Sequence, residues 1–341
     1  TTEYDEIRRG VSAILRQELE YIATRWSLET SYEEAGVDSN TQKREGLNSR
    51  ALVPSRSVDY SDTEQSVFGL SVDANTEVAS QWNAIWGGRY DHYDTFGNEF
   101  SPRVGMIFQP ANDTALKLIY SEAFRAPSAV ELKGSSFAQG STDLKPEIMQ
   151  NIELGLVKSA DHWELEWTLF HNQWDDRIVL VPFNQAGFTT KYVNSGESQS
   201  SGSEISLKNQ FNRWLLETSA SYIYSENTET GQWNSVFPKF IFNLGIGYSW
   251  PVQQVELFVA NSYHDLTNTG DHTLPPFVKT EAPAYFRTDL TINKSFKEHW
   301  EVGMALRNIF NRDNVLPSQA NSYNGVPDID FDAALTLSYR R

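Results

Sequence analysis

The sequence of 341 residues lacks cysteine altogether, which excludes a disulfide scaffold and a thiolate metal site. Positive charge is scarce: 28 lysines and arginines face 45 aspartates and glutamates, a balance that argues against nucleic acid as a partner. No run of 18 apolar residues occurs, so the sequence predicts no transmembrane helix. The mean hydropathy of −0.49 is typical of a soluble protein, but a transmembrane β-barrel hides its apolar residues at alternate positions.

What the sequence does contain is a regular alternation of apolar and polar residues from Ser66 onward. Hydrophobic residues make up 39% and aromatic residues 13% of the chain, too much for a disordered protein. In residues 300–307 and 329–339 every second residue is apolar, and those between are mostly polar, charged or small. Successive side chains of a strand point to opposite faces, so each segment has one apolar and one polar face. The sequence therefore predicts an all-β protein.

The connections between these segments alternate between long and short. The long ones are 125–146, 183–192, 225–236, 267–282 and 311–327, and the short ones are 110–113, 159–162, 209–213, 251–254 and 297–299. An up-and-down outer-membrane barrel has tight periplasmic turns and long outer loops, whereas a soluble sandwich gives no reason for this alternation. We therefore predict a transmembrane antiparallel up-and-down β-barrel in the bacterial outer membrane.

Large aromatic residues flank the short connections, including Phe108, Trp163, Trp214 and Trp250. Aromatic side chains at that level match the interfacial girdle of a membrane barrel. The polar face carries charges of both signs, which suits a wide barrel that encloses water or a plug. On the apolar face of the last strands we expect contact with outer-membrane lipid at Trp300, Val302, Met304, Leu306, Ile329, Phe331, Leu335, Leu337 and Tyr339.

The spacing of the segments gives the number of strands. Between Trp163 and Trp300 each strand with its connection takes about 23 residues, so residues 1–341 hold about 15 strands of one barrel domain. Bacterial single-chain barrels use even numbers of strands. We therefore expect the chain to be the C-terminal portion of a larger barrel whose first strands are missing.

Several short blocks resemble the β-barrel of TonB-dependent outer-membrane receptors. They are residues 87–91 (GGRYD), 100–105 (FSPRVG), 120–147 (YSEAFRAPSAVELKGSSFAQGSTDLKPE), 151–156 (NIELGL) and 307–312 (RNIFNR). The blocks follow the order of that family across residues 66–341. The resemblance implies a 22-stranded barrel filled by an N-terminal plug, which imports a scarce ligand with energy from the TonB complex. It also implies that the plug, which is not in this chain, forms part of the ligand site and contacts the TonB complex.

The cargo that the resemblance favours is a ferric siderophore or a similar iron chelate. Haem receptors of the family have a box like 124–127 (FRAP) and a second box, Asn-Pro-Asn-Leu, with a histidine between them. Here the second position reads 141–144 (STDL), and no histidine lies between the two, so haem is disfavoured. Haem, cobalamin and an oligosaccharide stay open as other cargoes, and a passive porin stays open as a different kind of barrel.

Candidate ligand-contacting residues come from the outer loops and the lumen face. The simpler interpretations are that Arg125 pairs with a neighbouring carboxylate at a strand end and that the histidines are ordinary surface residues. The candidates are Arg125, Glu131, Lys145, His264, His272, Arg287 and Arg307.

We expect neither a metal site, nor a cofactor, nor an enzyme. The six histidines have no metal-ligand spacing on a regular element. Asp328, Asp330 and Asp332 alternate along a strand and do not wrap around a calcium ion. No nucleophile elbow, phosphate loop or His-Glu-x-x-His motif occurs.

Overall fold

The computed structural model describes residues 2–20, 23–42, 64–135, 138–185, 188–233, 237–269, 280–296, 299–316 and 326–339. Fifteen strands form one sheet, and each pairs with its neighbour in antiparallel order. The prediction of an all-β antiparallel protein of about 15 strands is therefore confirmed. In order across the sheet, the strands are β1 (Thr2–Leu19), β2 (Thr24–Gln42), β3 (Glu64–Ala79), β4 (Trp82–Tyr93), β5 (Gly97–Ala111), β6 (Thr114–Arg125), β8 (Glu147–Ala160), β9 (Trp163–Asp175), β12 (Ser198–Phe211), β13 (Trp214–Asn227), β14 (Phe240–Trp250), β15 (Val255–His264), β18 (Tyr285–Phe296), β19 (Trp300–Arg307) and β22 (Asp332–Tyr339).

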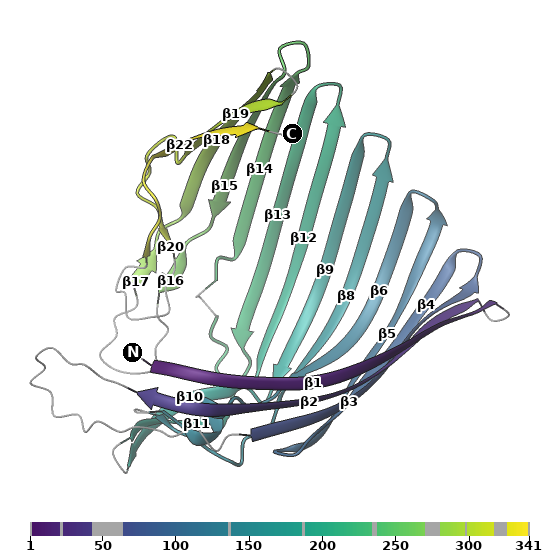
Figure 1. Cartoon of the computed structure of the whole chain (residues 1–341), viewed down its shortest axis with the longest axis vertical. Coiled ribbons are helices and arrows are strands. Elements are labelled where there is room, and N and C mark those ends of the chain that lie inside the picture. Colours follow the sequence, from purple (N-terminus) through teal and green to yellow (C-terminus); the bar gives the residue numbers. More distant parts are fainter. Residues whose placement is uncertain are drawn as a thin grey trace, which may run out of the picture.

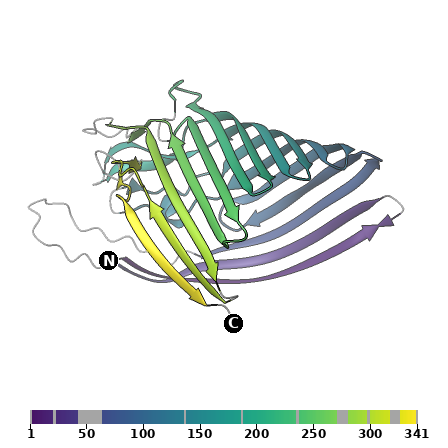
Figure 2. The same ribbon diagram turned by 90° about the horizontal axis from the view of Figure 1, so that it is seen from above.

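The sheet curves strongly, so that one face is concave and the other convex (Figures 1 and 2). Among the described residues, β1 pairs only with β2 and β22 only with β19, so the sheet is not closed on itself. Tight turns join the strands at one end, at the top of Figure 1, and long connections join them at the other, except for the three-residue connection 94–96 between β4 and β5. This is the predicted alternation of short turns and long loops.

The long connections contain small structures of their own. They hold the short strands β7 (Ala138–Gln139), β10 (Ile178–Gln185), β11 (Phe188–Asn194), β16 (Thr267–Thr269), β17 (Thr280–Ala282), β20 (Val315–Leu316) and β21 (Val326–Pro327), and the helix α1 (Ala129–Lys133). A plain loop was predicted at 183–192. These residues instead belong to the β10–β11 hairpin, which joins β7 in a three-stranded sheet. No helix in the described residues is long and apolar enough to cross a bilayer.

The convex face is a continuous apolar surface. Strand register places Leu118, Leu154 and Leu169 in one row across β6, β8 and β9, and all three side chains are exposed. The described residues include few buried apolar side chains, and most of those lie at the outer-loop end. A single-layer sheet with an exposed apolar face needs an apolar solvent, which the bilayer provides. Aromatic rings pack together near the tight turns: Trp82 stacks on Phe108, with centroids 4.4 Å apart, and Trp300 packs at a tilt against Tyr339, with centroids 5.0 Å apart.

The concave face is mostly polar, as the alternation predicted. Glu164, Lys208 and Glu217 share one row across β9, β12 and β13, and Lys208 forms an ion pair of 2.9 Å with Glu217. The rings of Phe170, against Gly202, and Phe258, against Gly245, depart from this pattern. The ring of Phe258 lies over Gly245, where any side chain would overlap it. Glycine is therefore required where this inward-facing aromatic packs flat on the wall.

An arginine in place of Leu335 tests which face of β22 contacts lipid. Leu335 is 77% exposed on the convex face, and a charge there should cost about 2–4 kcal/mol near the bilayer midplane. The measurement is the urea midpoint of the vesicle-embedded barrel, followed by heat-modifiable gel migration. Thr336→Arg is the matched control, because Thr336 lies on the concave face opposite Gly303 and should tolerate the charge. Equal midpoints for the two variants would contradict the assigned faces.

Candidate functional site

Arg125, the last residue of β6, closes the root of the outer loop that joins β6 to β8, residues 126–146. Its guanidinium donates two hydrogen bonds of 2.8 Å to Glu147, from Nε to Oε2 and from Nη2 to Oε1. It donates two more of 2.9 Å to Glu131, from Nη1 to Oε2 and from Nη2 to Oε1. The side chains of Glu131 and Glu147 are only 13% and 5% exposed. This bidentate geometry, available to arginine and not to lysine, ties both carboxylates to one guanidinium. We call Arg125, Glu131 and Glu147 the arginine clamp.

Glu131 has a second structural role at the start of α1. The backbone N–H of Glu131 donates to Ser128 Oγ at 3.3 Å, while the N–H and hydroxyl of Ser128 donate to Glu131 Oε2 at 2.7 Å and 2.9 Å. This reciprocal pattern is a capping box, which satisfies backbone donors that a helix start leaves free. The same carboxylate thus joins the helix to the arginine clamp.

The loop 126–146 is also joined to the next outer loop, residues 176–197. Asn194 Oδ1 accepts a hydrogen bond of 2.7 Å from the Lys145 N–H, and Asn194 Nδ2 donates to the carbonyls of Lys145 at 2.9 Å and Asp176 at 2.7 Å. Glu147 Oε1 accepts a further bond of 2.7 Å from the Ile178 N–H. Together with the β7–β11 pairing, these bonds make the two loops one folded unit.

The structure thus brings three predicted residues together and gives two of them internal partners. Arg125 and Glu131 bind each other, which agrees with the simpler interpretation that Arg125 pairs with a carboxylate at a strand end. Lys145 joins the loops through its backbone, and its side chain is exposed with no ion pair to a described carboxylate. A direct contact of these residues with a ligand stays a prediction.

Arg287 and Arg307 lie on the concave face near the last outer loop, and both are paired. Arg287 donates to Asp289 at 2.9 Å and to Asp328 at 3.2 Å, and Tyr285 also donates to Asp328, at 2.7 Å. Arg307 has only a long contact of 3.5 Å with Asp332. Burial raises the pKa of Asp328, but the hydrogen bonds from Tyr285 and Arg287 outweigh burial and hold that pKa below its ordinary value.

Of the two histidine candidates, the structure describes only His264. His264 stacks on Tyr285, with ring centroids 4.8 Å apart, and is hydrogen-bonded to Ser262 Oγ at 3.2 Å. His272 lies outside the described residues. No group of three metal-ligating side chains occurs within the part of the chain that the structure describes.

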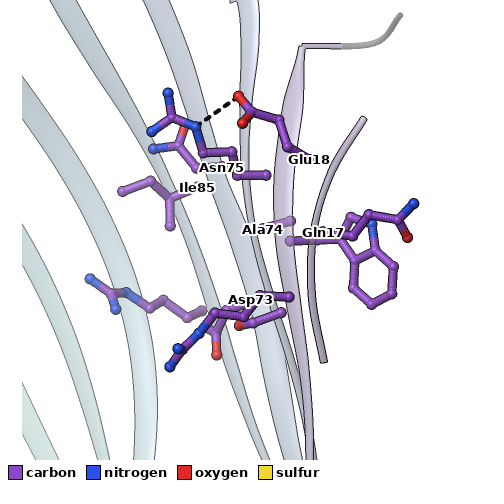
Figure 3. Close-up of a pocket in the computed structure, with 11 residues that line it drawn as sticks. Gln17, Glu18, Asp73, Ala74, Asn75 and Ile85 are labelled. Carbon is purple, nitrogen blue, oxygen red and sulfur yellow. Dashed lines mark hydrogen bonds and ion pairs between the residues drawn. The ribbon is translucent and has the colours of Figure 1, made fainter. Parts of the chain in front are cut away.

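A shallow cavity of about 650 Å³ lies at the tight-turn end of β1–β5 (Figure 3). Its lining includes Arg16, Arg25 and Arg103 beside Glu18 and Asp73, and Arg25 Nε donates to Glu18 at 3.1 Å. It is far along the sheet from the outer loops, so it is no extension of the arginine clamp.

A second cavity of about 260 Å³ lies on the concave face beneath the outer loops. We call it the vestibule pocket; its lining includes Asn172, Trp174, Arg177, Ser200, Trp233 and Phe237. None of these residues was predicted from the sequence to contact a ligand. The available signal was an arginine directly after an aromatic strand end, in the run Trp174-Asp175-Asp176-Arg177.

The family described as TonB dependent receptor-like, beta-barrel matches residues 2–309. The chain belongs to this family. TonB-dependent receptors are transport receptors of the outer membrane and not enzymes. The 15-stranded sheet corresponds to part of their 22-stranded barrel.

Similar receptors share low identity with the chain. The iron-regulated outer membrane virulence protein of Vibrio cholerae is 27% identical over 82% of this chain and 45% of its own length. The ferrienterobactin receptor of Escherichia coli is 26% identical over 74% of the chain and 36% of its length. The heme/hemopexin utilization protein C of Haemophilus influenzae is 24% identical over 66% of the chain and 36% of its length.

Among solved structures, the siderophore receptor PirA from Acinetobacter baumannii superposes with a TM-score of 0.81 at 16% identity, over 99% of this chain and 55% of that one. At this identity the likeness shows the fold alone. This receptor chain thus spans about half or less of the length of these relatives.

Lysine in place of Arg125 tests the arginine clamp in the receptor. Lysine keeps the charge but cannot form four hydrogen bonds to two carboxylates, so residues 126–146 should exchange their amide hydrogens at least tenfold faster. Hydrogen exchange by mass spectrometry measures this, and the sheet should stay protected. Arg307→Lys, at a single long ion pair, is the control and should leave the loop unchanged. Equal loop protection in Arg125→Lys and the wild type would disprove the clamp.

The arginine clamp should resist a fall in pH and open only when Glu131 becomes protonated. Burial raises the pKa of Glu131, but hydrogen bonds from Arg125 and Ser128 outweigh burial and hold that pKa below its ordinary value of about 4.3. Because the folded value is the lower one, the clamp keeps its stability above about pH 4.3 and loses it as the pH falls through the folded pKa. Loop exchange, corrected for its intrinsic pH dependence, should rise only at pH values below the ordinary pKa of a glutamate. A rise already between pH 5 and 6 would count against this, and Glu131→Gln should be open at every pH.

Proposed function

We propose that this chain is the barrel portion, with residues 1–341 as one domain, of a receptor that imports a ferric siderophore or a similar iron chelate. The energy comes from the TonB complex, which acts through a plug domain inside the completed barrel. Family membership supports a TonB-dependent transport receptor. The names of two relatives, one iron-regulated and one a ferrienterobactin receptor, support an iron chelate as its cargo.

The observation that carries the proposal is the contrast between the two faces of the sheet. The convex face exposes rows of leucine, tryptophan and tyrosine, whereas the concave face carries charges of both signs along its whole height. A curved wall of this kind separates lipid from an aqueous interior wide enough for a plug and a chelate. The folded unit of the two outer loops stands at the entrance of that interior.

The proposed mechanism has two stages. The outer loops and the top of the wall first capture the chelate, and the structure keeps their roots rigid through the arginine clamp. The chelate then passes along the charged inner wall when the plug is pulled, because paired charges such as Lys208 and Glu217 leave a hydrated path with no strong trap.

Two alternatives are tested by the same experiment. In the first alternative, the same kind of receptor imports haem, cobalamin or an oligosaccharide. A relative named for haem utilization supports haem among these. A passive porin would need neither a plug nor the TonB complex. The loop 126–146 contains no histidine, which favours a chelate over haem.

The decisive measurement is growth of an iron-starved strain that lacks its own receptors and expresses the full-length receptor containing this barrel. We expect rescue by a ferric siderophore only when TonB is present. Haem as the only rescuing source, together with a Soret band in the purified protein, would replace the siderophore by haem. Rescue that does not depend on TonB would identify a porin.

A further inference from the structure

The vestibule pocket contains an arginine with no acidic partner. Arg177 places the carbon of its guanidinium 4.9 Å from the centroid of the Trp174 ring. Its backbone is held by bonds of 3.2 Å and 3.0 Å to Gly196 and Ser195. Among the described carboxylates none forms an ion pair with it, whereas Arg125 and Arg287 each bind two. Arg177 is therefore a fixed cation that an incoming anion can use.

A second cation, Lys239, contacts the Trp233 ring from outside the lining of the pocket. Lys239 Nζ is 4.0 Å from the ring centroid of Trp233 and 5.4 Å from that of Tyr224. It too has no ion pair with a carboxylate of the described chain. Cation–π contacts keep both side chains in place without neutralising their charge.

The polar part of the lining adds hydrogen-bonding groups. Asn172 accepts a bond of 2.7 Å from Asn151 and donates one of 3.2 Å to Ser200 Oγ. In these bonds the Ser200 hydroxyl acts only as an acceptor, so its proton stays available for an oxygen anion.

The chemistry of the pocket selects a ligand with two properties. Two indoles and the Phe237 ring favour a flat aromatic group, and the unneutralised guanidinium of Arg177 favours negative charge on oxygen. A volume of about 260 Å³ is smaller than the roughly 300–1,000 Å³ that a drug-sized ligand needs. It accommodates one aryl group of a chelate, not a porphyrin. A non-aromatic chelate would leave the indole walls without a partner.

We propose that the vestibule pocket binds one aryl arm of an anionic aromatic iron chelate, of the ferric catecholate type. The ring stacks between Trp174 and Trp233, and Arg177 and Ser200 contact the oxygen atoms that carry the charge. The proposal rests on the proposed function, since it names the class of chelate that the receptor captures.

The test measures binding of two probes to the full-length receptor in detergent by isothermal titration calorimetry. The probes are the ferric complex of 2,3-dihydroxybenzoate and the non-aromatic ferric citrate. We expect the wild type to bind the aryl complex, and Arg177→Gln and Trp174→Leu each to weaken that binding at least fivefold. Arg177→Lys and Trp174→Phe should retain most of the affinity. Arg25→Gln, at the tight-turn end of the sheet and outside the pocket, is the control and should bind like the wild type; heat-modifiable migration checks that every variant is folded.

Two results would overturn the pocket assignment while leaving iron import intact. One is wild-type affinity for the aryl complex in both Arg177→Gln and Trp174→Leu, which would place the aryl site elsewhere. The other is binding of ferric citrate alone, which would exclude the aromatic class. Failure of every ferric chelate in the growth assay would instead disprove the proposed function itself, so the two failures are distinguishable.

Discussion

The constraint on which the whole structure depends is that a sheet of one layer must satisfy every backbone polar group by itself. Hydrocarbon offers no hydrogen bonds, so the ladder from β1 to β22 runs through fifteen strands with only local irregularities. Successive side chains along each strand then alternate between the lipid-facing side and the inner side of the sheet. This explains why a chain of mean hydropathy −0.49 exposes so many large apolar residues: half of each strand faces lipid and half faces a polar interior.

The same constraint explains why strand positions were predictable and loop structure was not. Alternation in a strand is a local signal, so the sequence yielded the number of strands, the two faces and the order of short and long connections. The β10–β11 hairpin was missed because it lies in a loop with no membrane to impose parity. The bonds between Lys145 and Asn194 join residues 49 positions apart, and no local pattern encodes them.

The candidate residues show a similar division. Arg125 was recognised from a family block, and its pairing with a carboxylate followed from elementary electrostatics, but the identity of both partners required the fold. Arg177 went unnoticed because an arginine after a strand end is common in any sequence. What distinguishes it is a place in the lining of a cavity on the concave face together with the lack of an acidic partner among the described residues, and only the three-dimensional arrangement reveals this combination.

Charged side chains with and without an acidic partner therefore have different roles in this protein. A guanidinium that already makes four hydrogen bonds must lose them before it can bind an anion, and that loss cancels most of the gain. The arginine clamp is thus suited to holding loop roots against the wall. Arg177 in the vestibule pocket has only a contact with an aromatic ring to give up, so it keeps its charge available for an anion. Arg125, Glu147, Trp174 and Ser200 all lie at the outer ends of sheet strands, so the rigid wall holds one side of both the clamp and the pocket, while Glu131, Trp233 and Phe237 from the connections complete them.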